Sequence, residues 1–287
     1  MTGGNGAPFA RLLVNADDFG ASERVDEGIA QAHSRGIVTA TSLMAVGRSF
    51  EHAVRLWREL PTLDVGVHLT LVAERPLLTS SSLVAADGRF PVDAAALLRR
   101  CLAGAIRLAE VEAEWAAQIE RVLSAGIRPS HLDSHQHVHV LPGLAGIAQR
   151  LAQRYGIPRL RLPLERPPTA WPAGAAELKR LAGLAALWLT WGTARLTGAA
   201  SPVGPRLNFL GFMTGGRLDE QALLRLVVGM RAGRDYELMC HPGLAPTEPD
   251  LLGWHYSHEE ELRALTSPRV QDELAARGIR LTRFSEL

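Results

Sequence analysis

Short apolar runs alternate with longer amphipathic segments along almost the whole chain, and this alternation constrains the fold more than any other feature. Runs rich in β-branched residues predict strands, and the segments between them predict helices. We expect strands at residues 11–16, 38–46, 63–69, 130–133, 158–165, 235–241 and 279–282. Strands alternating with helices predict an α/β fold with a mainly parallel sheet of about seven strands, either a barrel or a doubly wound sheet.

Helices fill the intervals between these strands. Capping residues and Gly or Pro stops predict helices at residues 22–35, 50–60, 92–125, 142–155 and 219–230, and another in the stretch before Arg195. Residues 75–91 carry turn signals and are expected to form a long loop. No repeat or low-complexity linker divides the chain, so we expect one domain at residues 11–287 behind a flexible tail at residues 1–10.

The composition excludes several classes of protein. The chain of 287 residues is 47% hydrophobic and 21% charged, as is usual for a globular protein. Lys plus Arg number 31 and Asp plus Glu number 30, so no basic excess points to nucleic acid. Cys101 and Cys240 lie too far apart to suggest a disulfide framework. The start, MTGGNGAPFA, lacks the features of a secretory signal peptide, so a cytoplasmic location is the default expectation.

One apolar segment tests that expectation. LAGLAALWLTWGTA, residues 181–194, is too short to span a bilayer before Arg195 interrupts it. It reads either as a buried helix or as a helix that lies against a membrane or an apolar substrate, and both readings stay open. Trp188 and Trp191 are spaced to share one face of such a helix.

Polar residues directly follow four of the expected strands. Asp17, His68, His135 and His241 each come after an apolar run. Active sites of parallel α/β folds form at the carboxyl ends of strands, so these four side chains are candidates for one site. His68 alone would more often be a satisfied core histidine, and Cys240 reads as a small buried residue.

The segment PSHLDSHQHVHVLP carries four histidines within nine residues: His131, His135, His137 and His139. If the segment stays extended, the last three share one face, because alternate residues of a strand point the same way. Imidazoles suit a divalent transition metal, and metal binding explains such a cluster better than a hydrogen-bonded loop. The pattern does not say which of these histidines bind.

Two adjacent carboxylates, Asp17 and Asp18, follow the first strand in NADDFG. A simple turn would explain them, because Asp and Gly both favour turns. Like charges side by side raise one another's pKa, and a cation between them would remove that cost. The pair therefore reads either as a turn or as part of the metal site.

The motifs NADDFG, GIVTATSLM, GVHLTL, HLDSHQHVH and MCHPG occur in this order between Leu12 and Leu281. Together they resemble the YdjC-like carbohydrate deacetylase family, which includes chitooligosaccharide deacetylases and a hopanoid-associated group. The resemblance implies an irregular (β/α) barrel of about seven strands, of the glycoside hydrolase/deacetylase type. Residues 167–216 carry no motif of the family.

The resemblance also implies roles for individual residues. It places the metal ligands at Asp18, His68 and His135, the catalytic base at Asp17 and the general acid at His241. One divalent ion is implied, Mg or Zn first, with Mn, Co or Ni also accepted by such ligands. His131 and His137 are expected in the second shell or near substrate. Arg161 is expected to orient Asp17 or contact substrate, unless it is a rim arginine.

The function implied is metal-dependent hydrolysis of the N-acetyl group of an amino sugar, such as an N-acetylglucosamine-containing oligosaccharide or glycolipid. The apolar segment at 181–194 favours a hydrophobic conjugate over a soluble polymer. A metal-dependent phosphoesterase and a non-catalytic sugar- or lipid-binding protein are the alternatives. Peripheral membrane contact and a homodimer are left open, and nucleic acid is not expected as a partner.

Overall fold

Seven strands form one sheet in the computed structural model, which describes residues 9–79, 81–167, 174–198 and 201–287. The expected tail falls mostly on residues 1–8, which lie outside the described residues. The strands are β1 (Arg11–Phe19), β2 (Ala40–Leu43), β3 (Asp64–Leu69), β4 (Leu132–Ser134), β5 (Asn208–Leu210), β6 (Asp235–Cys240) and β7 (Arg280–Leu281).

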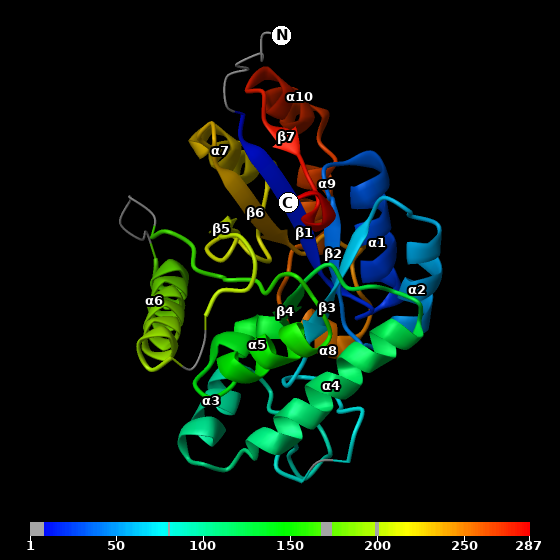
Figure 1. The fold of residues 1–287 in the computed structure, drawn as a ribbon. Helices are drawn as coiled ribbons and strands as arrows, with labels where there is room; N and C mark the ends of the chain where they lie inside the picture. The colour runs from blue at the N-terminus through cyan, green and yellow to red at the C-terminus, as the bar shows by residue number, and fades with distance from the viewer. Residues whose placement is uncertain (1–8, 80, 168–173, 199–200) are drawn as a thin grey trace, which may run out of the picture.

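All the strand pairs are parallel, and the sheet order is β4-β3-β2-β1-β6-β5. The short β7 pairs with the first two residues of β1, beside the longer pairing with β2. The sheet curls into a half-barrel with helices around it (Figure 1). The predicted α/β fold with about seven parallel strands in an irregular barrel is confirmed.

Helices cover the outer face of the sheet. Leu12, Val14 and Ala16 of β1 face them and share a buried core with Val25 and Ile29. The helices are α1 (Glu23–Arg35), α2 (Phe50–Arg58), α3 (Ala94–Leu102), α4 (Leu108–Ser124), α5 (Ala145–Arg154), α6 (Ala175–Leu196), α7 (Glu220–Gly229), α8 (Pro249–Leu252), α9 (His258–Leu265) and α10 (Pro268–Ala276), with 3₁₀ segments η1 (His135–Val140) and η2 (Phe284–Glu286).

The predicted strand at 158–165 is wrong except at one residue, since only Leu160 bridges to Leu132 of β4. Pro158 and Pro163 lack the N–H that a ladder needs, which explains the failure. The three-residue β5 was not predicted. The single helix expected at 92–125 is two helices, because the chain turns at Gly104 with a left-handed φ of 67°.

The inner face of the half-barrel changes from apolar to polar along β1. Leu13 packs with Ala40 and Phe284. The phenyl ring of Phe284, in η2, therefore fills the inside of the half-barrel near the amino end of β1. Two residues further on, Asn15 begins a buried polar layer, and Asp17 follows it at the carboxyl end. The inner face of β1 thus places Asp17 where the carboxyl ends of the strands meet, whereas the ion pair of Arg11 and Asp235 lies at the amino ends of β1 and β6.

Helix α6 satisfies both readings of the apolar segment in part. One face, with Leu187 and Trp191, is buried against Val140 and Leu164. The opposite face leaves Leu189 69% exposed. In Figure 1 this helix stands at the edge of the molecule, away from the sheet. Among the described residues, no helix combines the length and apolar character needed to cross a membrane.

Candidate functional site

A bulge at the end of β1 lets two adjacent carboxylates reach the same site. Ala16 pairs with Thr41 and Phe19 with Leu43, so β1 holds one more residue than β2 over this interval. The extra residue lies at Asp18, whose φ of 71° is left-handed. Successive strand residues normally face opposite sides, and the bulge removes that alternation.

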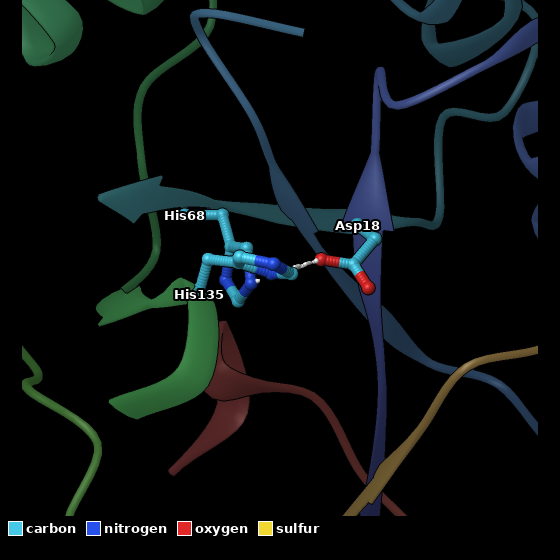
Figure 2. Close-up of side chains that lie close together, drawn as sticks. All are labelled: Asp18, His68 and His135. Atoms are coloured by element: carbon cyan, nitrogen blue, oxygen red, sulfur yellow. Dashed lines mark hydrogen bonds and ion pairs between the residues drawn. The ribbon is translucent and has the colours of Figure 1, made fainter. Parts of the chain in front are cut away.

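Asp18 meets two histidines from other strand ends. Its Oδ1 lies 2.8 Å from Nδ1 of His135 and 3.2 Å from Nε2 of His68. One ligand atom from each of the three residues lies within 4.8 Å of the others, and all three side chains are buried. Figure 2 shows the two rings directed at the carboxylate.

This group fits a divalent metal ion. Oδ2 of Asp18 and Nε2 of His135 are buried without a hydrogen-bond partner. Unpaired buried polar atoms are costly, so these two atoms need a ligand that the protein does not supply. One carboxylate and two imidazoles make a suitable donor set for a transition metal, with positions left for substrate or water.

Asp133 orients one of these histidines. Its Oδ1 lies 2.8 Å from Nδ1 of His68, which turns Nε2 of the ring toward Asp18. Burial lowers the pKa of His68, but the charges of Asp133 and Asp17 more than offset it and raise the pKa to about 10. A carboxylate behind a ligand histidine is a common device for fixing the ring and raising its basicity.

Arg161 holds Asp17, the neighbour of Asp18. Its Nη1 and Nη2 donate to the two oxygens of Asp17 at 2.6 and 2.8 Å. Nη1 also lies 2.7 Å from Asp133, and Nε donates to Glu237 at 2.6 Å. Burial raises the pKa of Glu237 to about 7 against the opposing effect of Arg161. Arg161 is only 3% exposed, so it orients Asp17 from inside the barrel.

Several buried partners in this network were missed at the sequence level. Asn15 donates through Nδ2 to Asp17 at 2.7 Å and to Ser42 at 2.8 Å. Ser42 in turn donates to Asp133 at 2.7 Å. Asn15 lies two residues before Asp17, so the alternation of inward-facing positions along the strand was the available signal.

His241 directly follows β6 and lines a cavity together with Asp17, His68 and His135. Its backbone N–H donates to Glu261 at 2.6 Å, and its carbonyl lies 2.9 Å from Nδ1 of His258. Its ring lies 4.5 Å from that of Tyr256, and its buried Nδ1 has no partner. Burial lowers the pKa of His241 to about 4 despite the opposing charges of Asp18 and Asp17.

The expectation that three histidines share an extended face is wrong. After His135 the chain enters η1, where Gln136 and His137 are left-handed with φ of 52° and 56°. His139 instead contacts Ser134 and the carbonyl of Arg161.

The other two candidate histidines lie in different places. His131 lies between Ser42 and Ser130 and stacks on Phe284. His137 lines the cavity, and its ring lies near Phe209 and Phe212.

The cavity that His68 and His135 border has a volume of about 320 Å³. Asp17, His68, His135 and His241 line it together with Arg180, Tyr256 and others. Pockets of this size with a few converging polar groups are typical of sites for small molecules. The arrangement can hold a metal ion, a carboxylate base and an imidazole around one bound group.

Comparisons with known proteins agree on one family. The model of a family described as YdjC-like protein matches residues 11–276. A carbohydrate deacetylase of Geobacillus stearothermophilus is 35% identical over 277 residues, which cover 96% of each chain. A chitooligosaccharide deacetylase of Serratia marcescens is 32% identical over 279 residues, covering 96% of this chain and 98% of the relative.

A solved structure is also similar over nearly its whole length. It is the crystal structure of an Enterococcus faecalis protein whose suggested role is cellobiose-phosphate cleavage. The two share 28% sequence identity and a TM-score of 0.73, and the match covers 96% of this chain and 98% of the other.

Proposed function

The chain belongs to the YdjC-like family, and from that membership and the geometry of its site we propose that it is a metal-dependent carbohydrate N-deacetylase. It hydrolyses the N-acetyl group of an amino sugar, such as an N-acetylglucosamine-containing oligosaccharide or glycolipid, and releases acetate. The names of two relatives support the reaction. The observation that carries the proposal is the buried group of Asp18, His68 and His135 beneath a cavity shared with Asp17 and His241.

Asp18, His68 and His135 would hold one divalent ion, with Mg or Zn expected first and Mn, Co or Ni also suited to the ligands. The ion supplies Lewis-acid chemistry, polarising the acetamide carbonyl and lowering the pKa of a water. The geometry favours a single ion. A second group of potential ligands, Asp17, His68 and Asp133, already has the Arg161 guanidinium bound to both of its carboxylates.

Asp17 is the base of the proposed reaction. Its carboxylate is held at both oxygens by Arg161 and at one by Asn15, so its orientation toward the cavity is set before substrate binds. It takes the proton from the attacking water, and the acetamide carbon becomes tetrahedral. A preset orientation avoids paying for reorganisation during the reaction.

His241 is the acid that releases the amine. Because burial lowers its pKa to about 4, the resting imidazole is mainly neutral at pH 7, and before the amine leaves it gains the proton that Asp17 took from the water. Once formed, an imidazolium of such low pKa transfers its proton readily to a departing amine. The backbone N–H of His241 donates to Glu261 and its carbonyl lies next to Nδ1 of His258, and these two contacts hold the residue at the site.

The alternatives fit less well. A phosphoesterase with two or three metals needs further free ligands, and the guanidinium of Arg161 blocks the second group. A non-catalytic sugar- or lipid-binding protein has no need of Asp17 and His241 around the same cavity.

We extend the proposal to a single catalytic unit at residues 11–287 that acts in the cytoplasm. The exposed apolar face of α6, including Leu189 and Leu196, supports contact with a membrane or with a hydrophobic conjugate. A homodimer remains a prediction.

Acetate release tests the proposed function. The purified protein is stripped with a chelator, reloaded with Zn, Mg, Mn, Co or Ni, and given N-acetylglucosamine, diacetylchitobiose and an N-acetylglucosamine glycolipid. We expect acetate release only after metal is restored. The reloaded protein should hold about one metal ion per chain. Undiminished acetate release from the stripped protein, or release of phosphate from sugar phosphates instead, would contradict the proposal.

A further inference from the structure

A tyrosine hydroxyl without a protein partner belongs to the wall of the reaction cavity. Tyr256 lies in the loop between α8 and α9, is half-buried, and lines the cavity together with Asp17 and His241. The hydroxyl of a buried tyrosine usually finds a hydrogen-bond partner. In the part of the chain that the structure describes, the hydroxyl of Tyr256 makes no hydrogen bond. It can therefore donate to a molecule bound in the cavity.

The ring of Tyr256 is fixed by three neighbours. The ring of His241 lies 4.5 Å from it, and the ring of Trp254 lies 5.9 Å from it. The backbone of Gly216 is the third neighbour, since a Cβ added there would lie 2.5 Å from Cδ1 of the tyrosine. The N–H of Ser257 donates to the carbonyl of Gly216 at 2.8 Å and holds the two segments together. The position of the hydroxyl is thus set before substrate binds.

The surrounding charges indicate where the hydroxyl lies. Burial raises the pKa of Tyr256, and the charges of Asp18 and then Asp17 raise it further. Because electrostatic effects weaken with distance, the hydroxyl lies on the side of the cavity where these carboxylates stand. Trp254 borders the same side, with its ring 4.7 Å from that of His135. A phenol keeps its proton at pH 7, so the hydroxyl is a hydrogen-bond donor.

The proposed reaction creates negative charge in this cavity. As the oxygen of water bonds to the acetamide carbon, its proton passes to Asp17 and the π electrons of the carbonyl move onto the acetyl oxygen. When the carbonyl forms again, the C–N bond breaks and the amine takes a proton from His241. A donor directed at the acetyl oxygen accelerates the reaction, because its hydrogen bond is stronger when that oxygen is charged.

We propose that Tyr256 is a further catalytic residue, whose hydroxyl donates a hydrogen bond to the acetyl oxygen as that oxygen becomes negative. The proposal rests on the proposed function, since it concerns the same reaction in the same cavity. The hydroxyl keeps its own proton throughout, so its role differs from those of Asp17 and His241. Arg180 also lines the cavity, but its guanidinium already donates to three backbone carbonyls, so Tyr256 is the better placed donor of the two.

Tyr256→Phe tests the hydroxyl alone, because it keeps the ring that packs against His241 and Gly216. Tyr155→Phe is the matched control, since it removes a tyrosine hydroxyl that bonds to Glu120 near the end of α5, outside the cavity. Acetate release from diacetylchitobiose by the metal-loaded proteins gives kcat and KM at several pH values. Calorimetry gives their affinities for N-acetylglucosamine and for a glucosamine methylphosphonamidate, in which a tetrahedral phosphorus bearing a charged oxygen replaces the acetyl carbon.

We expect Tyr256→Phe to lower kcat about 10- to 100-fold and to change KM less than about threefold, because the lost bond strengthens only in the transition state. The phosphonamidate should bind about 10- to 100-fold more weakly, and N-acetylglucosamine less than about threefold more weakly, since only the analogue presents a charged oxygen. The reduction in kcat should be the same from pH ~6 to ~9, where a phenol keeps its proton. Metal content should stay unchanged, and Tyr155→Phe should match the parent.

A kcat equal to that of the parent would overturn the proposal, as would equal losses of affinity for the analogue and for N-acetylglucosamine. A reduction in kcat that varies over this pH range would overturn it as well, because the hydroxyl would then be transferring its proton. If the parent protein releases no acetate from any N-acetyl sugar, the proposed function fails instead. The two affinities of Tyr256→Phe relative to the parent would still decide whether the hydroxyl favours a charged tetrahedral group.

Discussion

Asp17 and Asp18 are neighbours of the same residue type, yet their partners differ completely. Asp17 is held by Arg161 and Asn15, whereas Asp18 contacts only histidines and keeps one oxygen unpaired. The difference in partners supports a division of labour in which Asp18 binds metal and Asp17 moves a proton.

The Asp17→Asn substitution tests this division. The amide keeps the shape of the carboxylate but cannot accept the proton of the water, so activity should fall about 10²–10⁴-fold while bound metal is retained. Metal content and acetate release are measured on the same sample. Asp18→Asn is the control, and it should lose the metal. Loss of metal from Asp17→Asn would show that Asp17 is itself a ligand.

Asp133→Asn tests the carboxylate behind His68. The amide oxygen can still accept from Nδ1 of His68, but the negative charge that raises the basicity of the ring is gone. We expect metal affinity to fall about 10- to 100-fold, as for other partners of ligand histidines. Competition with a chromogenic chelator gives the affinity. An unchanged affinity would mean that the charge of Asp133 serves Arg161 rather than His68.

At the level of single residues, the sequence patterns indicated the groups that stand at strand ends. Asp17, Asp18, His68, His135 and His241 follow apolar runs. The structure gathers Asp17 and the three histidines around one cavity and places Asp18 next to two of these histidines. The sequence did not predict roles for three buried polar residues, Asn15, Ser42 and Glu237. A single polar residue within a strand does not indicate a function until its neighbours in the folded protein are known. The positions of Gln136 and Tyr256 at the cavity depend on loop geometry that no local pattern encodes.

Strand β3 carries a constraint two residues before His68. A Cβ added at Gly66 would lie 2.4 Å from Cε1 of His131. That ring cannot retreat, because it is bonded between Ser42 and Ser130 and stacks on Phe284. Gly66 is therefore required for close packing between β3 and the ring.

Gly66→Ala should destabilise the protein by about 1–3 kcal/mol, the usual cost of overpacking a tight core. Because β3 would shift, metal affinity should also fall. Urea unfolding and metal titration measure the two effects. Gly126→Ala is unsuitable as a control, because its φ of 87° is strained for alanine. Gly192→Ala, where the added Cβ meets nothing, serves instead.

Helix α1 is attached through a buried acid to the turn that directly follows β1. Asp26 accepts from the backbone N–H of Gly20 at 2.6 Å and lies 3.1 Å from Nδ1 of His52. Burial raises the pKa of Asp26 to about 6, although hydrogen bonds from Ser49, Gly20 and His52 oppose the shift. The folded protein thus holds this proton more tightly than the unfolded chain does.

This linkage sets the sign of a pH effect. Between pH ~4 and ~6 the unfolded chain loses the Asp26 proton before the folded protein does, so the stability contributed by this group falls as pH rises. Asn at position 26 has no such dependence. The stability of Asp26→Asn relative to the parent should therefore increase from pH ~4 to ~7, by at most about 3 kcal/mol.

Urea unfolding of both proteins at several pH values measures the difference. Asp272→Asn, at an exposed position on α10, controls for the loss of a carboxylate. A difference between Asp26→Asn and the parent that stays constant across this range would contradict the prediction.

Element boundaries show why the sequence predicts some parts of the fold better than others. Strands β1, β3 and β6 were predicted because their apolar runs are long and their ends are marked by polar residues. The bridge at Leu160 and the three-residue β5 were not, since their pairing is decided by the neighbouring strands. The split between α3 and α4 depends on one left-handed glycine within a helical pattern.

For the molecule as a whole, the metal should act as part of the fold. Unpaired Asp18 Oδ2 and His135 Nε2 lie buried where three strand ends meet, so an ion bound there stabilises only the folded state. At an ion concentration ~100 times the dissociation constant the gain is about 2.7 kcal/mol. For a chain of this size it should raise the melting temperature by about 4–5 °C.

Calorimetric melting with and without a chelator measures this shift. His68→Ala should melt at the same temperature in both conditions. A melting temperature of the parent protein that does not respond to any divalent ion would show that the three ligands do not form a site.

The α/β class and parallel sheet of the whole molecule follow from the alternation of strands and helices, which is a property of the entire sequence. How far the sheet closes does not, because closure depends on two short segments near Leu160 and β5 that pair with different neighbours. The surroundings of α6 were equally undecided. Its pattern allowed burial or exposure, and the folded helix has one face of each kind.

The bulge in β1 makes the site depend on the number of residues in the strand as well as on their identity. Deleting one residue between Ala16 and Phe19 would leave the ladder to β2 continuous, with as many residues on β1 as on its partner. The remaining carboxylate would then have to serve either the metal or the proton, and no substitution elsewhere could restore the other. Such a shortened chain should fold into the same half-barrel and lack the reaction. Insertions and deletions at this point are therefore as informative about activity in related sequences as the aspartates themselves.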